Sequence, residues 1–122
     1  MTGNDKTEET VRLSAAHHTV DSIRVVTLRG EIDHTTRDVV ENALLGQDDT
    51  TRPPGVVADL EGVSFMDSSG LNVFISAHRQ ISEAGGWLRI AAAQEAVQRV
   101  LCLVGVDTVI DCHPTLTQAL DS

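Results

Sequence analysis

The sequence has few aromatic residues and few positive charges for its length. Only 2% of its 122 residues are aromatic, and tyrosine is absent. Stacking platforms for nucleic-acid bases and aromatic cages for sugars or cations are therefore poorly supplied. Nine Lys plus Arg stand against 18 Asp plus Glu, which gives a formal net charge of −9. Because phosphate binding depends on positive charge, nucleic acid and anionic membranes are disfavoured as partners.

Cysteines, metal-ligand patterns and long apolar runs are also scarce. The two cysteines, Cys102 and Cys112, form no CxxC motif, so neither a disulfide scaffold nor a thiolate metal site is indicated. The histidines show none of the HxH, HxxxH or HExxH spacings, and we expect no metal site. The longest apolar run, 100–106, is far shorter than the roughly 20 residues that span a bilayer. Since the N-terminus lacks the apolar core of a secretory signal, a cytoplasmic protein is expected.

The length and the 41% hydrophobic content are typical of a single domain with one modest core. Residues 1–10 are polar and lack periodicity, which predicts a disordered tail before a domain over residues 11–122. Neither GxGxxG nor GxxxxGK[ST] occurs, so no nucleotide cofactor is expected.

Hydrophobic periodicity predicts strands that alternate with helices. Two extended segments, 11–17 and 23–32, are joined around 20–22 and are expected to pair antiparallel. The other predicted elements are strands at 56–60, 63–66, 87–91 and 108–110, a loop over 47–55, and helices that begin after Thr35, Asp67 and Gln94 and at Pro114. Alternation implies parallel strands with right-handed crossovers. The expected class is α/β, a small mixed sheet with an antiparallel edge pair and parallel strands, packed with about four α-helices.

Two hydroxyl groups lie where a predicted strand ends and a helix begins, in Asp67-Ser68-Ser69-Gly70. Open amides at a helix start and the helix dipole favour an anion by about 0.3 to 1 kcal/mol, so a phosphoserine would be tolerated. From the spacing alone an ordinary N-cap is the simpler interpretation, because Asp and Ser are preferred cap residues. A nucleophilic serine is a third alternative, but no GxSxG motif surrounds either serine.

Three segments resemble the STAS domain of bacterial anti-sigma-factor antagonists. They are 30–34 (GEIDH), 56–60 (VVADL) and 63–71 (VSFMDSSGL). The string FMDSSGL in this context is specific, whereas GEID alone would be weak. The resemblance continues through Gly85-Gly86 to the helix that closes at Gly105. It implies the STAS fold over most of the chain.

The resemblance also implies a partner-switching regulator and not an enzyme. In such systems an antagonist with a free serine binds an anti-sigma factor, which is also an ATP-dependent serine kinase, and so releases a sigma factor. The kinase phosphorylates the first serine of DSSG, here Ser68, and a PP2C-type phosphatase restores it. The partner-binding residues that the resemblance implies are Asp33, His34, Asp67, Ser69, Gly70, Leu71, Asn72 and Val73.

Particular roles follow from this comparison. Leu71 and Val73 would supply apolar contacts, and Gly70 would keep the backbone open to the kinase active site. Asn72 departs from the family, in which a second glycine is frequent, and its side chain would alter which kinase fits. An alternative keeps the fold without the switch, as a constitutive scaffold or ligand-binding subunit of a larger assembly.

Overall fold

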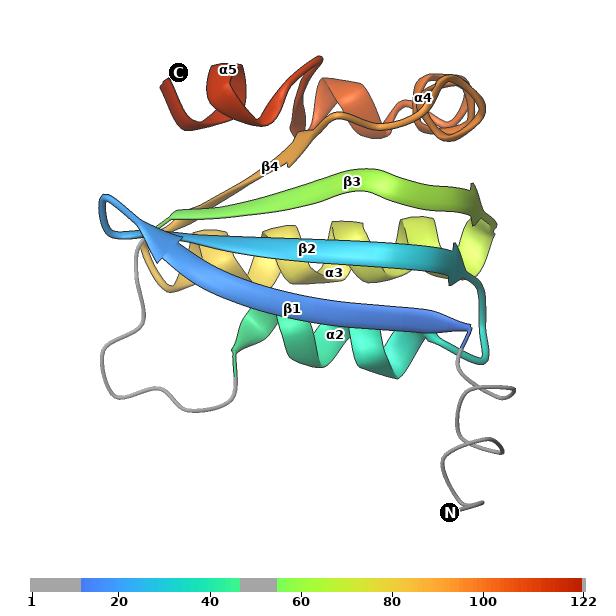
Figure 1. The fold of residues 1–122 in the computed structure, drawn as a ribbon, viewed down its shortest axis with the longest axis horizontal. Helices are drawn as coiled ribbons and strands as arrows, with labels where there is room; N and C mark the ends of the chain where they lie inside the picture. Colours follow the sequence, from blue (N-terminus) through green and yellow to red (C-terminus); the bar gives the residue numbers. More distant parts are fainter. Residues whose placement is uncertain (1–11, 47–54, 122) are drawn as a thin grey trace.

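Five strands form one mixed sheet in the computed structural model, which describes residues 12–46 and 55–121 (Figure 1). The strand order is β1-β2-β3-β4-β5; the β1–β2 pair is antiparallel and the other neighbours are parallel. The strands are β1 (Leu13–Val20), β2 (Ile23–Ile32), β3 (Gly55–Met66), β4 (Trp87–Ala91) and β5 (Asp111–His113). The helices are α2 (Arg37–Leu45), α3 (Ser68–Glu83), α4 (Glu95–Leu103) and α5 (Leu116–Asp121), with a 3-10 turn, η1 (Val106–Thr108), after α4. The predicted fold class is confirmed.

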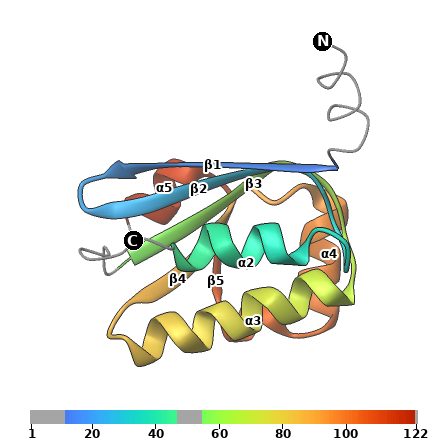
Figure 2. The same cartoon turned by 90° about the horizontal axis from the view of Figure 1, so that it is seen from below.

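The helices cover the two faces of the sheet unequally. Figures 1 and 2 show α2 and α3 lying next to each other across one face, and α5 on the opposite side. The main core lies between the first face and α2, α3 and α4, and its largest fully buried side chain is Phe74. A smaller cluster joins α5 to β3 and β4 through Val57, Ala91 and Ala119. Ile23, the first residue of β2, packs against the edge of this smaller cluster.

The antiparallel pair is joined by a two-residue turn. Asp21 and Ser22 both have positive φ, at 51° and 71°, and Val20 lies opposite Ile23. Two consecutive positive φ angles are typical of the type I′ turn, whose twist matches that of the strands it joins. β1 therefore continues to Val20, beyond the predicted end at residue 17.

Four boundaries differ from the sequence prediction, besides the end of β1. Helix α5 begins at Leu116, two residues after the predicted start at Pro114. The predicted strands 56–60 and 63–66 are one strand, β3, which stays paired with β2 through two register shifts. The predicted strand 108–110 is wrong, because the amides of Val109 and Ile110 donate to the carbonyl of Val106 and hold this segment in a tight turn. Helix α2 begins at Arg37 after Thr36, not directly after the predicted cap Thr35.

Some expectations concern segments that the structure does not describe. The predicted tail at 1–10 lies outside the described residues. The predicted loop at 47–55 also lies outside them, except for Gly55, which is the first residue of β3. In the described part of the chain, no helix is both long enough and apolar enough to span a membrane.

Candidate functional site

Helix α3 begins at Ser68 because Asp67 caps it. The Asp67 carboxylate accepts hydrogen bonds from the amides of Ser69, at 2.9 Å, and Gly70, at 3.2 Å. The Asp67 amide in turn donates to the carbonyl of Ile32 at 3.1 Å. These bonds fix the start of α3 against the carboxyl end of β2, so Ser68 lies near the segment that follows β2.

The capping arrangement changes the expectation of open amides at this helix start. The amides of Ser69 and Gly70 are already bonded to Asp67, and the amide of Leu71 donates to the Asp67 carbonyl at 3.1 Å. The Ser68 amide, which precedes these three in the chain, is the first amide of the helix. It therefore has no acceptor within the helix. An anion attached to Ser68 would thus gain little from the helix amides and would lie beside a carboxylate.

The two serines differ in accessibility. Ser68 is exposed, whereas Ser69 is half-buried. His34, which follows β2, is exposed as well. An enzyme active site can therefore reach the Ser68 hydroxyl more readily than that of Ser69.

The next turn of α3 faces the core. Leu71 is 4% exposed and Val73 is 8% exposed, and both belong to the main core. Gly70 is also buried, and a Cβ there would lie 2.5 Å from the Ile32 side chain and 2.9 Å from that of Met66. The structure thus gives Gly70 a packing role in the close contact of α3 with the sheet, in place of the open approach to a kinase that was expected.

Asn72 is the exposed member of this turn. It lies in a shallow groove of about 280 Å³ between α2 and α3, to which Arg37, Asp38 and Glu41 also contribute. Ser68, the predicted phosphorylation site, and Asn72, a predicted contact residue, are therefore exposed in the first turns of α3. The predicted contact residues Leu71 and Val73 are buried in the core.

Asp33 is held by the fold and is only 8% exposed. Its carboxylate accepts hydrogen bonds from the Thr35 amide, at 2.9 Å, and from the Thr35 hydroxyl, at 2.6 Å. Arg12 lies 3.0 Å from the same carboxylate and also pairs with Glu31. The Asp33 amide donates to the Thr36 hydroxyl at 2.9 Å, which completes a closed loop before α2. Asp33 thus shapes the segment that presents His34.

These contacts lower the pKa of Asp33, chiefly through the hydrogen bond from the Thr35 hydroxyl; the nearby Arg12 charge adds to the effect and burial opposes it. A lowered folded-state pKa stabilises the fold above the unfolded value of about 3.9, and this contribution is lost as the pH falls through the lowered pKa. We expect Asp33→Asn to lower the urea midpoint at neutral pH and to bring it closer to wild type at about pH 3. Glu61→Gln, at an exposed position of β3, is the control and should change neither midpoint. A wild-type midpoint for Asp33→Asn at neutral pH would contradict this role.

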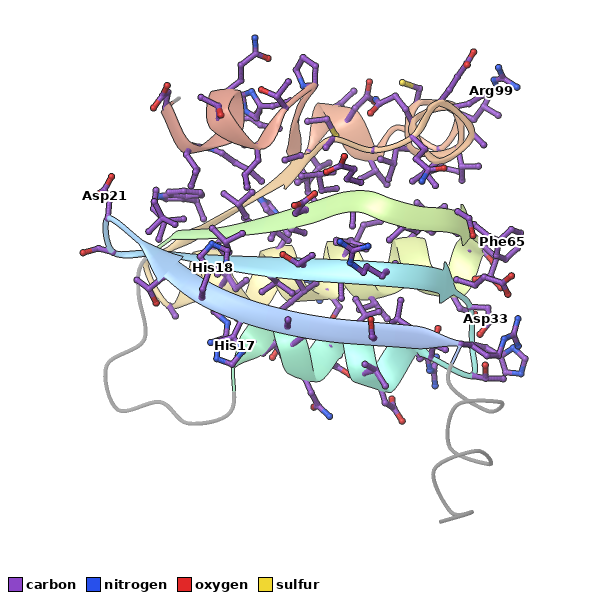
Figure 3. The ribbon with its side chains drawn as sticks, in the orientation of Figure 1. His17, His18, Asp21, Asp33, Phe65 and Arg99 are labelled. Carbon is purple, nitrogen blue, oxygen red and sulfur yellow. The ribbon has the colours of Figure 1, made fainter. Side chains whose placement is uncertain are left out.

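Phe65 is a surface residue that the sequence analysis did not select. It is 47% exposed and lies at the same end of the sheet as Asp33 (Figure 3). In the pairing of β2 with β3, Gly30 lies opposite Val63 but Glu31 lies opposite Phe65, so Ser64 is an extra residue in β3. Such a bulge interrupts the alternation of side chains and accounts for the exposure of both Ser64 and Phe65. In the sequence, Phe65 could have been selected because it is one of few aromatic residues and lies three positions before Ser68.

The sequence model of the STAS domain matches residues 14–119. The chain belongs to the STAS domain family. It is 30% identical over 116 residues to the anti-sigma-F factor antagonist RsfA of Mycobacterium tuberculosis, covering 92% of this chain and 87% of that protein. Relatives of this STAS domain are thus named as anti-sigma factor antagonists.

Solved structures agree with this assignment. The crystal structure of an anti-sigma factor antagonist from Mycobacterium paratuberculosis superimposes with a TM-score of 0.78 at 28% identity, over 89% of this chain and 92% of that one. The Bacillus cell fate determinant SpoIIAA in its phosphorylated form gives a TM-score of 0.67 at 20% identity, over 88% and 97% of the two chains. The latter identity supports the fold of this STAS domain alone.

Proposed function

We propose that this STAS domain is an anti-sigma factor antagonist whose activity is switched at Ser68. With a free Ser68 it binds an anti-sigma factor that has serine kinase activity, and so releases a sigma factor in the cytoplasm. The observation that carries the proposal is that Ser68 is exposed at the start of α3, on a helix fixed by the Asp67 cap. Phe65 is exposed at the same end of the sheet as Asp33 (Figure 3), and His34, which follows Asp33, is exposed as well. Both would supply contacts around Ser68.

Phosphorylation at this position would oppose binding through local charge. A phosphoserine adds about −1.5 to −2 charges near neutral pH. The amides of Ser69 and Gly70 already serve Asp67, so they are not available to neutralise the phosphate. Burying such a dianion in an interface costs its hydration without an opposite charge to replace it. A PP2C-type phosphatase that removes the phosphate would restore binding.

The relatives support the general role. The Mycobacterium tuberculosis relative, which is 30% identical to this chain, is named an anti-sigma-F factor antagonist. For this chain, the kinase, the phosphatase and the modified residue remain part of the proposal.

The proposal is tested by incubating the full chain with ATP and each anti-sigma factor kinase encoded in its source genome. Intact-mass measurement and peptide sequencing should find one phosphate on the wild-type chain, at Ser68. Ser68→Ala should remove the product, whereas Ser69→Ala should retain it, because the amide that bonds to Asp67 is unchanged by that substitution. No product with any kinase, or an undiminished product from Ser68→Ala, would contradict the assignment.

A further inference from the structure

The edge strand β1 differs from the rest of the chain in its charge. Its eight residues, Leu13–Val20, contain no Asp, Glu, Lys or Arg, although the whole chain carries a formal charge of −9. Six consecutive side chains, 14–19, are exposed. Figure 3 shows His17 and His18 on opposite sides of the strand, as alternation requires. β1 is therefore an uncharged strand with both faces open.

The outer edge of β1 lacks the usual protection against pairing. Exposed edges in native proteins are commonly blocked by a charged side chain, a proline or a bulge. β1 has neither a charge nor a proline, and its register with β2 runs without a shift from Leu13 to Val20. Within the described residues, no strand pairs with its outer edge. The strand is a ready template for a further antiparallel strand.

The hairpin geometry decides which backbone groups point outward. A two-residue type I′ turn makes Val20 and Ile23 a hydrogen-bonded pair, and such pairs then alternate along the ladder. Even-numbered residues of β1 thus direct their amide and carbonyl groups to β2. The odd-numbered residues, Leu13, Ala15, His17 and Thr19, direct their amide and carbonyl groups to the open edge.

We propose that β1 pairs antiparallel with β1 of a second copy of this chain, around a two-fold axis at Ala16. In this register Leu13 lies opposite Thr19 of the other copy and Ala15 opposite His17, which uses all four outward-facing residues of each strand. Ser14 then lies opposite His18, so each histidine faces a small side chain across the interface. An isologous contact of this kind closes as a dimer, because it uses the β1 edge of both copies.

A groove beside β1 is consistent with this occupant. It measures about 420 Å³ and lies between β1 and α2, with Ala15, His17, Val39 and Ala43 among its lining residues. Val39 is 42% exposed, although it is a large aliphatic residue. A strand added along β1 would lie next to this groove, where its side chains can cover Val39.

The self-complementary register and the charge of β1 both suit a second copy of this chain. A second copy brings an uncharged strand to an uncharged strand, so no like charges meet along the paired edge. The repulsion between two chains of net charge −9 acts elsewhere and is screened beyond about 8 Å at physiological ionic strength. The proposal rests on the edge of the sheet and is independent of Ser68 and of the proposed function.

Sedimentation equilibrium of the full chain tests the proposal, at about 0.15 M salt and from micromolar to millimolar concentration. The wild-type chain should form a reversible dimer. Ala16→Lys places two lysines opposite each other at the axis, and Ala16→Glu does the same with two carboxylates, so each alone should dimerise about tenfold more weakly or worse. An equimolar mixture of the two variants should recover dimers, because the opposite charges then face each other.

Ala96→Lys and Ala96→Glu are matched controls at an exposed position of α4 and should dimerise as wild type does. Circular dichroism and urea midpoints establish that the Ala16 variants are folded. A monomeric wild-type chain at the highest concentration overturns the proposal and leaves a strand of another protein as the occupant. Undiminished dimers of either Ala16 variant, or a mixture no better than its components, also overturn it.

Discussion

Ser68→Glu is expected to weaken binding to the anti-sigma factor by about a hundredfold, a loss of about 2.8 kcal/mol, and phosphorylation of Ser68 to weaken it further. The reason is local. The new charge lies next to the Asp67 carboxylate, which already uses the amides of Ser69 and Gly70. Titration calorimetry with the purified anti-sigma factor measures the change. Ser68→Gln has the size of the Glu variant without its charge, and it should retain most of the wild-type affinity.

The salt dependence of this effect separates local charge from the overall field of the protein. Screening weakens interactions between exposed charges that are further apart than the Debye length, about 10 Å at 0.1 M and 3 Å at 1 M. A penalty that arises from burying a charge in the interface persists at high salt. The ratio of the Ser68→Gln to the Ser68→Glu affinity should therefore fall only in part as salt is raised. Equal affinities for the two variants at low salt would contradict a charge-based switch.

Leu71→Ala is expected to lower the free energy of unfolding by about 2 to 5 kcal/mol, the usual cost of such a truncation in a packed core. Leu71 is 4% exposed and packs in the core that joins α3 to the sheet. The cavity would form directly behind the helix start that carries Ser68. Urea denaturation followed by circular dichroism measures the loss. An unchanged midpoint would show that Leu71 does not support the helix.

Asn72→Ala is the matched control for the same turn of α3. Asn72 is exposed, so its truncation should change the free energy of unfolding by no more than about 0.5 kcal/mol. Its effect should instead appear in partner affinity, because Asn72 lies in the groove between α2 and α3. Comparing the two variants in both assays separates residues that contact a partner from residues that position the contacting surface.

Local patterns were sufficient to predict most of the fold. The period of the apolar residues predicted α3 and placed Leu71 and Phe74 on one helix face, and both are buried. The alternation of strands and helices predicted parallel strands after an antiparallel pair, which the sheet order confirms. Periodicity gave a wrong strand at 108–110. Ile110 is buried, but it lies in a turn and not in the sheet, and a run of β-branched residues cannot distinguish the two.

The candidate site divides in the same way. Residue patterns predicted the fold class and the helix that begins after Asp67, and the resemblance of FMDSSGL to the STAS family selected Ser68. The accessibility of the neighbouring side chains depends on the tertiary structure. Phe65 is exposed because β3 has an extra residue relative to β2, and Asp33 is held because Arg12, 21 positions away, reaches its carboxylate. Strand register and ion pairs depend on contacts between distant segments, which periodicity along one segment does not report.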